Sequence, residues 1–171
     1  MPRLHGKKVM LREYRKDDLE HIRKWVTDGE TTRNLSDSFL FPHSVTQSED
    51  FLNMMMSGKG EMKGFVIADA KTEAYIGQLD LIKIDWKNRC ARLGIVIGDK
   101  SNRGKGYGTE AIKLLQKFVF EEMNLNRLDL EVRDFNGAGQ GCYKNCGFVE
   151  EGRLRQNLFV GGKYVDTIVM S

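Results

Sequence analysis

The sequence predicts a single α/β domain of the α+β kind, with a mixed, mostly antiparallel sheet of about seven strands flanked by helices. Strand-like segments follow one another at about 63–69, 75–85 and 90–97, and their short polar connections suit antiparallel pairing. A glycine-rich loop and an amphipathic helix come next. The chain of 171 residues is long enough to bury roughly 70 % of its unfolded surface in one core and too short for two ordinary domains.

The N-terminal part predicts one strand and two helices. The strand is expected at Lys7–Tyr14, and Asp17 or Asp18 caps the helix that follows. The apolar positions of that helix fall on one face: Leu19, Ile22 and Val26. Thr46 and Glu49 form a capping-box pattern ahead of an apolar run, which predicts the second helix.

The C-terminal part predicts the remaining elements. The helix after the glycine-rich loop buries one face against the sheet, because its apolar residues recur at helical spacing: Ala111, Leu114, Leu115, Phe118 and Val119. A strand is expected at about Leu128–Val132, a short helix at about Gly139–Asn145, and two last strands joined at Gly161-Gly162. The order is therefore β-α-α-β-β-β-α-β-α-β-β. Since no linker or low-complexity stretch is visible, residues 1–171 are expected to form one domain.

Composition excludes several classes of protein. The chain is 40 % hydrophobic and 30 % charged, as is usual for a soluble globular protein, and no apolar run approaches the ~18 residues that span a membrane. The net charge of +3 is small and scattered, which disfavours nucleic-acid binding. The N-terminus lacks the apolar core of a signal peptide, and three cysteines do not suggest a disulfide framework. We therefore expect a cytoplasmic protein.

The segment Arg103–Gly108 predicts a phosphate-binding loop. It alternates glycine with other residues, carries Arg103 and Lys105, and stands between an apolar strand and a helix. Where glycines leave out the Cβ atom, successive backbone N–H groups can close on an anion, and the helix dipole and two cations add attraction. A phosphorylated cofactor is therefore expected here.

Two other phosphate-binding motifs fit less well. Gly106, Gly108 and Ala111 match the dinucleotide pattern G-x-G-x-x-A, and Glu131 stands about twenty residues on, where a ribose ligand is expected. In that motif, however, the first glycine follows its strand almost directly, whereas residues 99–105 intervene here. A P-loop is also disfavoured, because no Lys-Ser or Lys-Thr pair follows the required glycine spacing.

The loop and the residues after it resemble the GNAT superfamily of acetyl-CoA-dependent N-acetyltransferases. Arg103–Gly108 satisfies every position of the family's cofactor-loop signature, which is Gln or Arg, two residues, Gly, one residue, then Gly or Ala. The spacing of Asn136, Tyr143 and Gly147-Phe148 is similar to the Asn, Tyr and Gly-Phe spacing in the family's last helix and following strand. The expected element order matches as well, so the resemblance covers essentially the whole chain.

Within the superfamily, two segments resemble one branch, which holds ribosomal-protein N-terminal acetyltransferases and spermidine acetyltransferases. These segments are Gly147–Gly152 and the closing hairpin Gly162–Asp166. The chain departs from that branch at Arg92, where many relatives carry a glutamate that can act as a base. The helix with Tyr143 is also rich in glycine, and each interior glycine costs about 0.5–1 kcal/mol relative to alanine.

The resemblance implies a role for each matched residue. Backbone N–H groups would hold the pyrophosphate of acetyl-CoA at Arg103, Gly104, Lys105, Gly106, Tyr107, Gly108 and Thr109. The amide-like pantetheine arm would pair with a strand edge at Ile95, Val96 and Ile97, as in β-augmentation. Asn136 would hydrogen-bond the same arm. A backbone N–H near Val96 would stabilise the oxyanion that forms when the amine attacks.

Tyr143 is the expected catalytic acid. The conjugate acid of a thiolate has a pKa near ~8.5 and a tyrosine near ~10, which is close enough for the phenol to donate a proton as the C–S bond breaks. The alternative is a core tyrosine whose hydroxyl bonds to a backbone group. Cys142 and Cys146, four residues apart, are expected to pack rather than to bind a metal, and no metal site is expected.

The acceptor is expected to be a primary amine. Without a glutamate at Arg92, the α-amine of a peptide or protein N-terminus is favoured, because its pKa of about 7.7–8.0 leaves more neutral amine than a lysine-like pKa near 10.4. A polyamine is the alternative and would need an acidic pocket, for which the candidates are Glu13, Asp37, Asp80 and Glu131. Other small amines stay open, because residues 31–43 carry no readable motif. A non-catalytic acyl-CoA-binding module is the alternative of another class, and a homodimer is left open.

Overall fold

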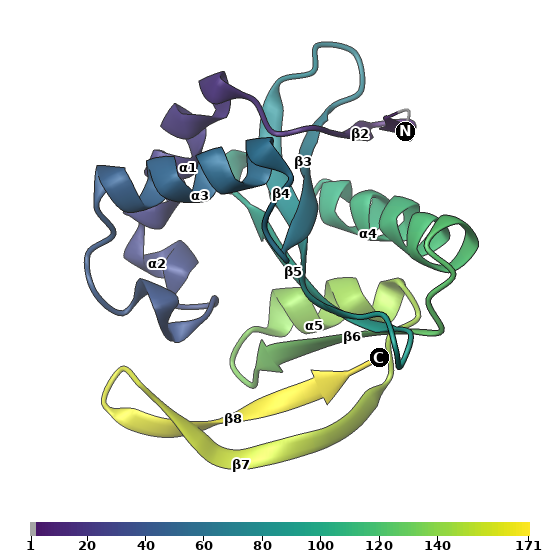
Figure 1. Cartoon of the computed structure of the whole chain (residues 1–171). Helices are drawn as coiled ribbons and strands as arrows, with labels where there is room; N and C mark the ends of the chain where they lie inside the picture. The colour runs from purple at the N-terminus through teal and green to yellow at the C-terminus, as the bar shows by residue number, and fades with distance from the viewer. Residues whose placement is uncertain (1–2) are drawn as a thin grey trace.

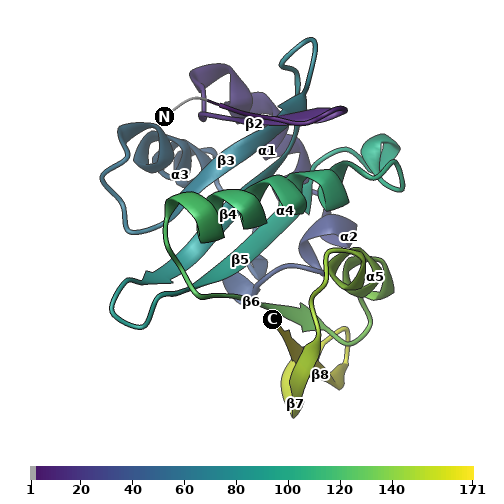
Figure 2. The ribbon, with the colours of Figure 1, turned by 90° about the vertical axis from the view of Figure 1, so that its right-hand side faces the viewer.

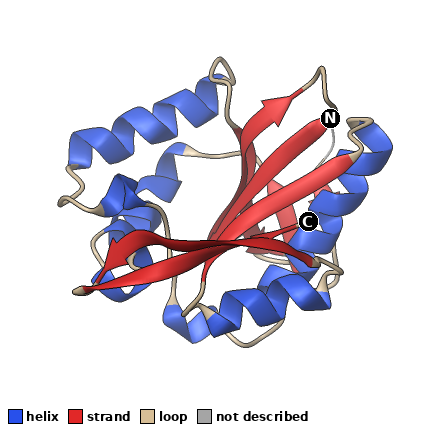
Figure 3. Ribbon diagram, turned by 90° about the horizontal axis from the view of Figure 1, so that it is seen from below, coloured by secondary structure: helices blue, strands red, loops and turns tan. Residues whose placement is uncertain are grey.

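The computed structural model describes residues 3–171 and contains one sheet in the order β1-β2-β3-β4-β5-β6-β8-β7. Helices cover both of its faces (Figure 1, Figure 3). The strands are β1 (Leu4–His5), β2 (Val9–Arg12), β3 (Lys63–Asp69), β4 (Tyr75–Asp85), β5 (Cys90–Ile97), β6 (Arg127–Arg133), β7 (Glu150–Val160) and β8 (Lys163–Met170). The helices are α1 (Leu19–Val26), α2 (Gly29–Thr32), α3 (Val45–Ser57), α4 (Tyr107–Lys117) and α5 (Gly137–Asn145). The fold class is as the sequence predicts.

The sheet divides between β5 and β6, its two parallel neighbours. Their registered pairs end at Arg92 opposite Asp129, although β5 continues to Ile97 and β6 to Arg133. From Leu130 onward, β6 pairs only with β8, which lies on its other edge. The two strands therefore diverge, and the strands fan out in two directions when the molecule is seen from below (Figure 3).

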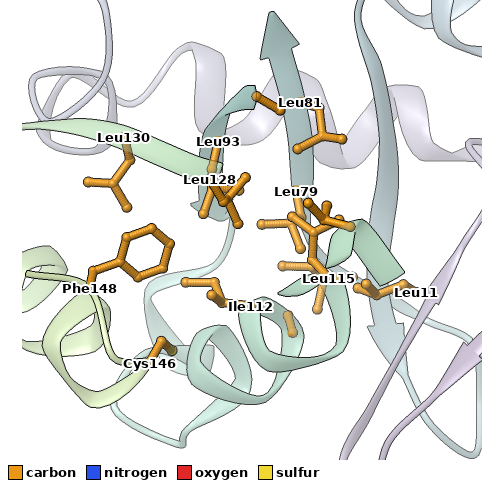
Figure 4. Close-up of a cluster of buried hydrophobic side chains, with 14 of the residues drawn as sticks. Leu11, Leu79, Leu81, Leu93, Ile112, Leu115, Leu128, Leu130, Cys146 and Phe148 are labelled. Atoms are coloured by element: carbon orange, nitrogen blue, oxygen red, sulfur yellow. The ribbon is translucent and has the colours of Figure 1, made fainter. Parts of the chain in front are cut away.

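Side chains alternate across the sheet and form two cores. Ile67, Leu79 and Leu93 face α4 and belong to the larger core, which also contains Phe148 after α5 (Figure 4). Val66 and Ala68 face the opposite way and pack with α1 and α3. This alternation is the period of two that a strand imposes, and Figure 2 shows α4 lying across the strands of the first face. No helix within residues 3–171 is both long and apolar enough to cross a membrane.

Three expectations for the N-terminal half need correction. The strand expected at Lys7–Tyr14 is shorter, and residues 4–12 form the two-stranded hairpin of β1 and β2, which raises the strand total to eight. The capping box of α3 is made by Ser44 and Gln47, whose side chains each accept the other's backbone N–H at 3.1 and 2.8 Å, so Thr46 and Glu49 lie inside the helix. The sequence predicts two helices before β3, but the short helix α2 adds a third, in a segment that carries no motif.

Asp18 precedes α1 as expected, but its carboxylate does not cap that helix. It accepts two hydrogen bonds from the guanidinium of Arg12, at 2.8 and 3.0 Å, and one from the backbone N–H of Arg15 at 2.7 Å. Arg12 and Asp18 are 3 % and 2 % exposed. Arg12 also donates to the carbonyls of Glu13 and Glu73, so each nitrogen of the buried guanidinium has a partner.

We expect Asp18→Asn to lower the free energy of unfolding by about 3 kcal/mol, because it leaves the Arg12 guanidinium buried without its counter-charge. Asp17→Asn is the matched control, since Asp17 is exposed one residue earlier in the chain. Urea denaturation of the three proteins measures the difference. Equal stability of both variants would show that the buried ion pair does not anchor α1.

Candidate functional site

The loop before α4 has the backbone geometry of an anion site. Gly104 and Gly106 adopt left-handed conformations with φ of 72° and 81°, which favour glycine. Gly106 is the N-cap of α4 and offers no side chain to the first N–H groups of the helix. Those donors therefore remain available to a bound anion, and the positive end of the helix dipole points the same way.

A lysine that the sequence did not single out lies beside this loop. Lys8 Nζ donates to the carbonyl of Lys105 at 3.0 Å, and it would lie 3.6 Å from a Cβ built on Gly106. The carboxylate of Glu110 in α4 accepts the backbone N–H groups of Lys7, Lys8 and Val9 at 2.8–2.9 Å. Burial opposes ionisation of Glu110, but these three donors hold its pKa below the ordinary value.

Glu110 thereby fixes the turn between β1 and β2 to the first turn of α4. A cavity of about 370 Å³ opens there, lined by Lys7, Lys8, Lys71 and Lys105 among others. Its lining carries one acidic residue, Asp69, whose carboxylate accepts two backbone N–H groups at 2.8–2.9 Å. The surroundings of the loop are therefore cationic because of tertiary packing as well as sequence.

Arg103 does not direct its guanidinium toward the loop. It donates to the Thr31 hydroxyl at 2.8 Å and to the Ile97 carbonyl at 3.4 Å, so it ties α2 to the end of β5. The expectation that its side chain adds cationic attraction for a phosphate stays a prediction, since the guanidinium has protein partners in this structure. The backbone N–H of Arg103 donates to the Lys100 carbonyl at 3.1 Å and is therefore not free for a phosphate, whereas Lys8 Nζ lies beside the loop as a second cation.

The edge of β5 that faces β6 carries unused backbone groups. Val96 is registered opposite Gln78 on β4. The Gly98 N–H, two residues on, donates to the carbonyl of Ile76 on β4 at 3.0 Å. N–H groups point alternately to the two edges of a strand. Alternation therefore directs the N–H groups of Ile95 and Ile97, rather than that of Val96, into the opening between β5 and β6.

The start of α5 explains one of its glycines. Asn136 is the N-cap and its Oδ1 accepts the Gly139 N–H at 3.0 Å. A Cβ built on Gly139 would lie 2.6 Å from Asn136 Nδ2, so a side chain there would displace the cap, whereas Gly137 and Gly141 have open space. The Asn136 Nδ2 donors make no hydrogen bond within residues 3–171 and stay available to a ligand.

Tyr143 lies in α5 against the main core. Its ring meets Phe148 edge to face, with the centroids 6.1 Å apart. Burial raises its pKa well above the ordinary value, so the phenol stays protonated at neutral pH. Within residues 3–171 its hydroxyl makes no hydrogen bond. The geometry therefore lacks the backbone partner that a purely structural tyrosine would have.

Packing between α4 and α5 brings the site residues together. A Cβ on Gly108 would lie 3.5 Å from Cys142 Sγ and 3.7 Å from Ile95 Cδ1, so the loop lies between β5 and α5. Cys142 Sγ is 3.5 Å from the Thr109 hydroxyl, and Cys146 is buried. No group of three histidine, cysteine or acidic side chains suited to a metal occurs in residues 3–171.

Arg92 is bound to carboxylates at the point where β5 and β6 part. Its Nε donates to Asp129 and its Nη1 to Glu131, both at 2.7 Å. The hydrogen bond to Asp129 is the main reason that the pKa of Arg92 is raised. The side chain therefore remains charged and cannot accept a proton. Glu131 is occupied by this pair, which also disfavours the ribose role of the dinucleotide alternative.

The four acidic residues that could have made a polyamine pocket are dispersed. Glu13 pairs with Arg3, Asp37 with Arg133, and Glu131 with Arg92. Asp80 is buried under α1 and α3, where it accepts from Tyr14 and Gln78. Burial raises the Asp80 pKa to about 7, against the lowering effect of those two donors.

Comparison with known proteins agrees with this geometry. The family model described as an acetyltransferase (GNAT) domain matches residues 8–149. A spermidine N(1)-acetyltransferase of Vibrio cholerae is 32 % identical over 123 residues, which cover 72 % of this chain and 69 % of that protein.

Two solved structures are similar over nearly their whole length. A spermidine N-acetyltransferase of Vibrio cholerae, in complex with CoA and spermine, has a TM-score of 0.84 at 28 % identity, covering 96 % of this chain and 95 % of that one. A ribosomal L7/L12 α-N-protein acetyltransferase in complex with coenzyme A has a TM-score of 0.85 at 17 % identity, covering 99 % and 96 %, and shows the fold alone. Because the family model covers most of the chain, the protein belongs to the GNAT acetyltransferase family and is an N-acetyltransferase.

Proposed function

We propose that the protein transfers the acetyl group of acetyl-CoA to the α-amine of a peptide or protein. The observation that carries the proposal is the opening between β5 and β6, together with the glycine-capped start of α4, where Gly108 lies between Ile95 of β5 and Cys142 of the helix that carries Tyr143. The choice of acceptor rests on Arg92 and on the dispersal of acidic side chains.

The binding site for coenzyme A extends along three elements. The pyrophosphate lies on the backbone N–H groups of the α4 terminus, with Lys8 and Lys105 beside it. The amides of the pantetheine arm pair with the free edge of β5 at Ile95–Ile97, and Asn136 Nδ2 donates to the same arm. The glycines of the loop leave space for the phosphates where side chains would otherwise meet them.

The reaction then needs an oxyanion donor and an acid. The amine nitrogen attacks the thioester carbonyl, and an N–H group of Ile95–Ile97 stabilises the oxyanion. The C–N bond forms, the C–S bond breaks, and Tyr143 donates its proton to the departing sulfur; the amine loses a proton to solvent, and the Tyr143 phenolate takes one back from solvent. Since Arg92 replaces a base, the acceptor must arrive neutral, which suits an α-amine with a pKa of about 7.7–8.0.

A polyamine is the second candidate acceptor, because spermidine N-acetyltransferases of Vibrio cholerae are among the proteins most similar to this chain. A polycation would need a cluster of carboxylates, and the four candidates are paired or buried. Thiol release from acetyl-CoA, measured over peptides, polyamines and aminoglycosides, tests these acceptors together. Cofactor binding without thiol release above background for any amine would indicate a non-catalytic acyl-CoA-binding module.

Tyr143→Phe should lower kcat on the best acceptor by about 10²–10⁴, the usual range for one positioned acid. The ring packing against Phe148 and the affinity for coenzyme A should be retained, because only the hydroxyl is removed. A kcat within threefold of the parent, with a loss of about 1 kcal/mol in stability, would instead identify a structural tyrosine.

Gly106→Val should weaken coenzyme A binding at least tenfold in calorimetry, because the added side chain occupies the space where phosphate meets backbone N–H groups. The strain of a left-handed valine also costs about 1–3 kcal/mol of stability. Gly58→Val is the matched control: Gly58 ends α3 with φ of 66° and open space around it, remote from the loop. Equal affinity in both variants would remove the phosphate assignment.

A further inference from the structure

A second cavity lies beside the end of β6. It measures about 310 Å³ and lies between two surface segments, residues 29–40 and the turn of the β7–β8 hairpin. Figure 1 shows that turn below α2. The apolar lining of the cavity includes Phe39, Leu40 and Phe159. Leu40 is 74 % exposed and Phe159 is 63 % exposed.

The cavity is fixed to the ends of both diverging strands. On one side, Arg103 joins Thr31 of α2 to the carbonyl of Ile97, the last residue of β5. On the other side, the cavity is lined by Arg133, the last residue of β6. The Arg133 carbonyl accepts the backbone N–H of Asn136, the cap of the helix that carries Tyr143, at 2.9 Å. Hydrogen bonds therefore link the walls of the cavity to the end of β5 and to the helix that carries Tyr143.

The cavity carries more positive than negative charge. Its lining contains Arg33 and Arg133 but one acidic residue, Asp37. Arg133 is 8 % exposed and donates to Asp37 at 2.8 Å. Arg33 is exposed, lies 5.3 Å over the ring of Phe135, and has no hydrogen bond to a carboxylate within residues 3–171. One guanidinium is therefore left to bind an acceptor group.

We propose that this cavity binds the acceptor and that Arg33 selects peptides with an acidic side chain close to the N-terminus. The inference rests on the proposed acetyl transfer to an α-amine and adds the class of peptide. A carboxylate makes a charge-assisted hydrogen bond with a guanidinium, and the exposed apolar residues suit an uncharged neighbouring side chain. A polycation would meet an uncompensated positive charge at the same position.

Acetylation of synthetic peptides tests the proposal. The peptides share one sequence and carry Glu, Gln or Lys at position two, three or four, and spermidine is assayed beside them. With the unmodified protein, kcat/KM should be about tenfold higher for Glu than for Gln at one or more positions, and lowest for Lys and spermidine. Arg33→Glu should reverse the order of Glu and Lys.

Arg155→Glu is the matched control, because Arg155 is exposed on β7 and does not line the cavity. It should leave the order unchanged. Arg33→Gln should abolish the difference between Glu and Gln, and it serves if Arg33→Glu fails to fold, as thermal unfolding would show. Equal acetylation of Glu, Gln and Lys peptides, or a preference for spermidine, overturns the inference while leaving acetyl transfer intact. Absence of transfer to every amine refutes the proposed function itself.

Discussion

The arrangement of the site depends on the separation of β5 from β6. The two strands are paired up to Arg92 and Asp129. The Arg92 side chain binds the carboxylates of Asp129 and of Glu131, two residues further along β6. Beyond this ion pair, β6 turns to β8 and leaves the last five residues of β5 with one free edge. Backbone groups at that edge need partners when they are covered. A ligand with amide groups supplies them, which is why the opening suits the pantetheine arm.

Tertiary packing places charges and helix ends around this opening. Glu110 binds three backbone N–H groups at the start of β2 and brings Lys8 beside the loop of α4, while Arg103 holds α2 at the far end of β5. The carboxylates considered for a polyamine are instead paired with separate arginines or buried. The proposed phosphate site and the proposed choice of acceptor therefore rest on these tertiary contacts as well as on the glycine motif.

Much of the fold could be predicted, because strand alternation and glycine turns are local signals. The strands expected at 63–69, 75–85 and 90–97 are found with those bounds, and Gly161 and Gly162 form the expected hairpin turn with φ of 59° and 83°. Ser44 and Thr46 offer equivalent capping patterns, so sequence alone could not choose between them. The contacts of Arg103 and Lys8 join residues 72 and 97 positions apart, and no local pattern encodes such contacts. Only the assembled sheet shows that Ile95 and Ile97, rather than Val96, present their N–H groups to the opening.

Amide hydrogen exchange at β5, followed by NMR with and without coenzyme A, tests the central claim most directly. Exchange of the Ile95 and Ile97 amides should slow at least tenfold when coenzyme A binds, because the ligand takes the place of water at the free edge. Exchange of the Val96 amide should change little, since that group faces β4. Unchanged exchange at both Ile95 and Ile97 in the saturated complex would contradict the account.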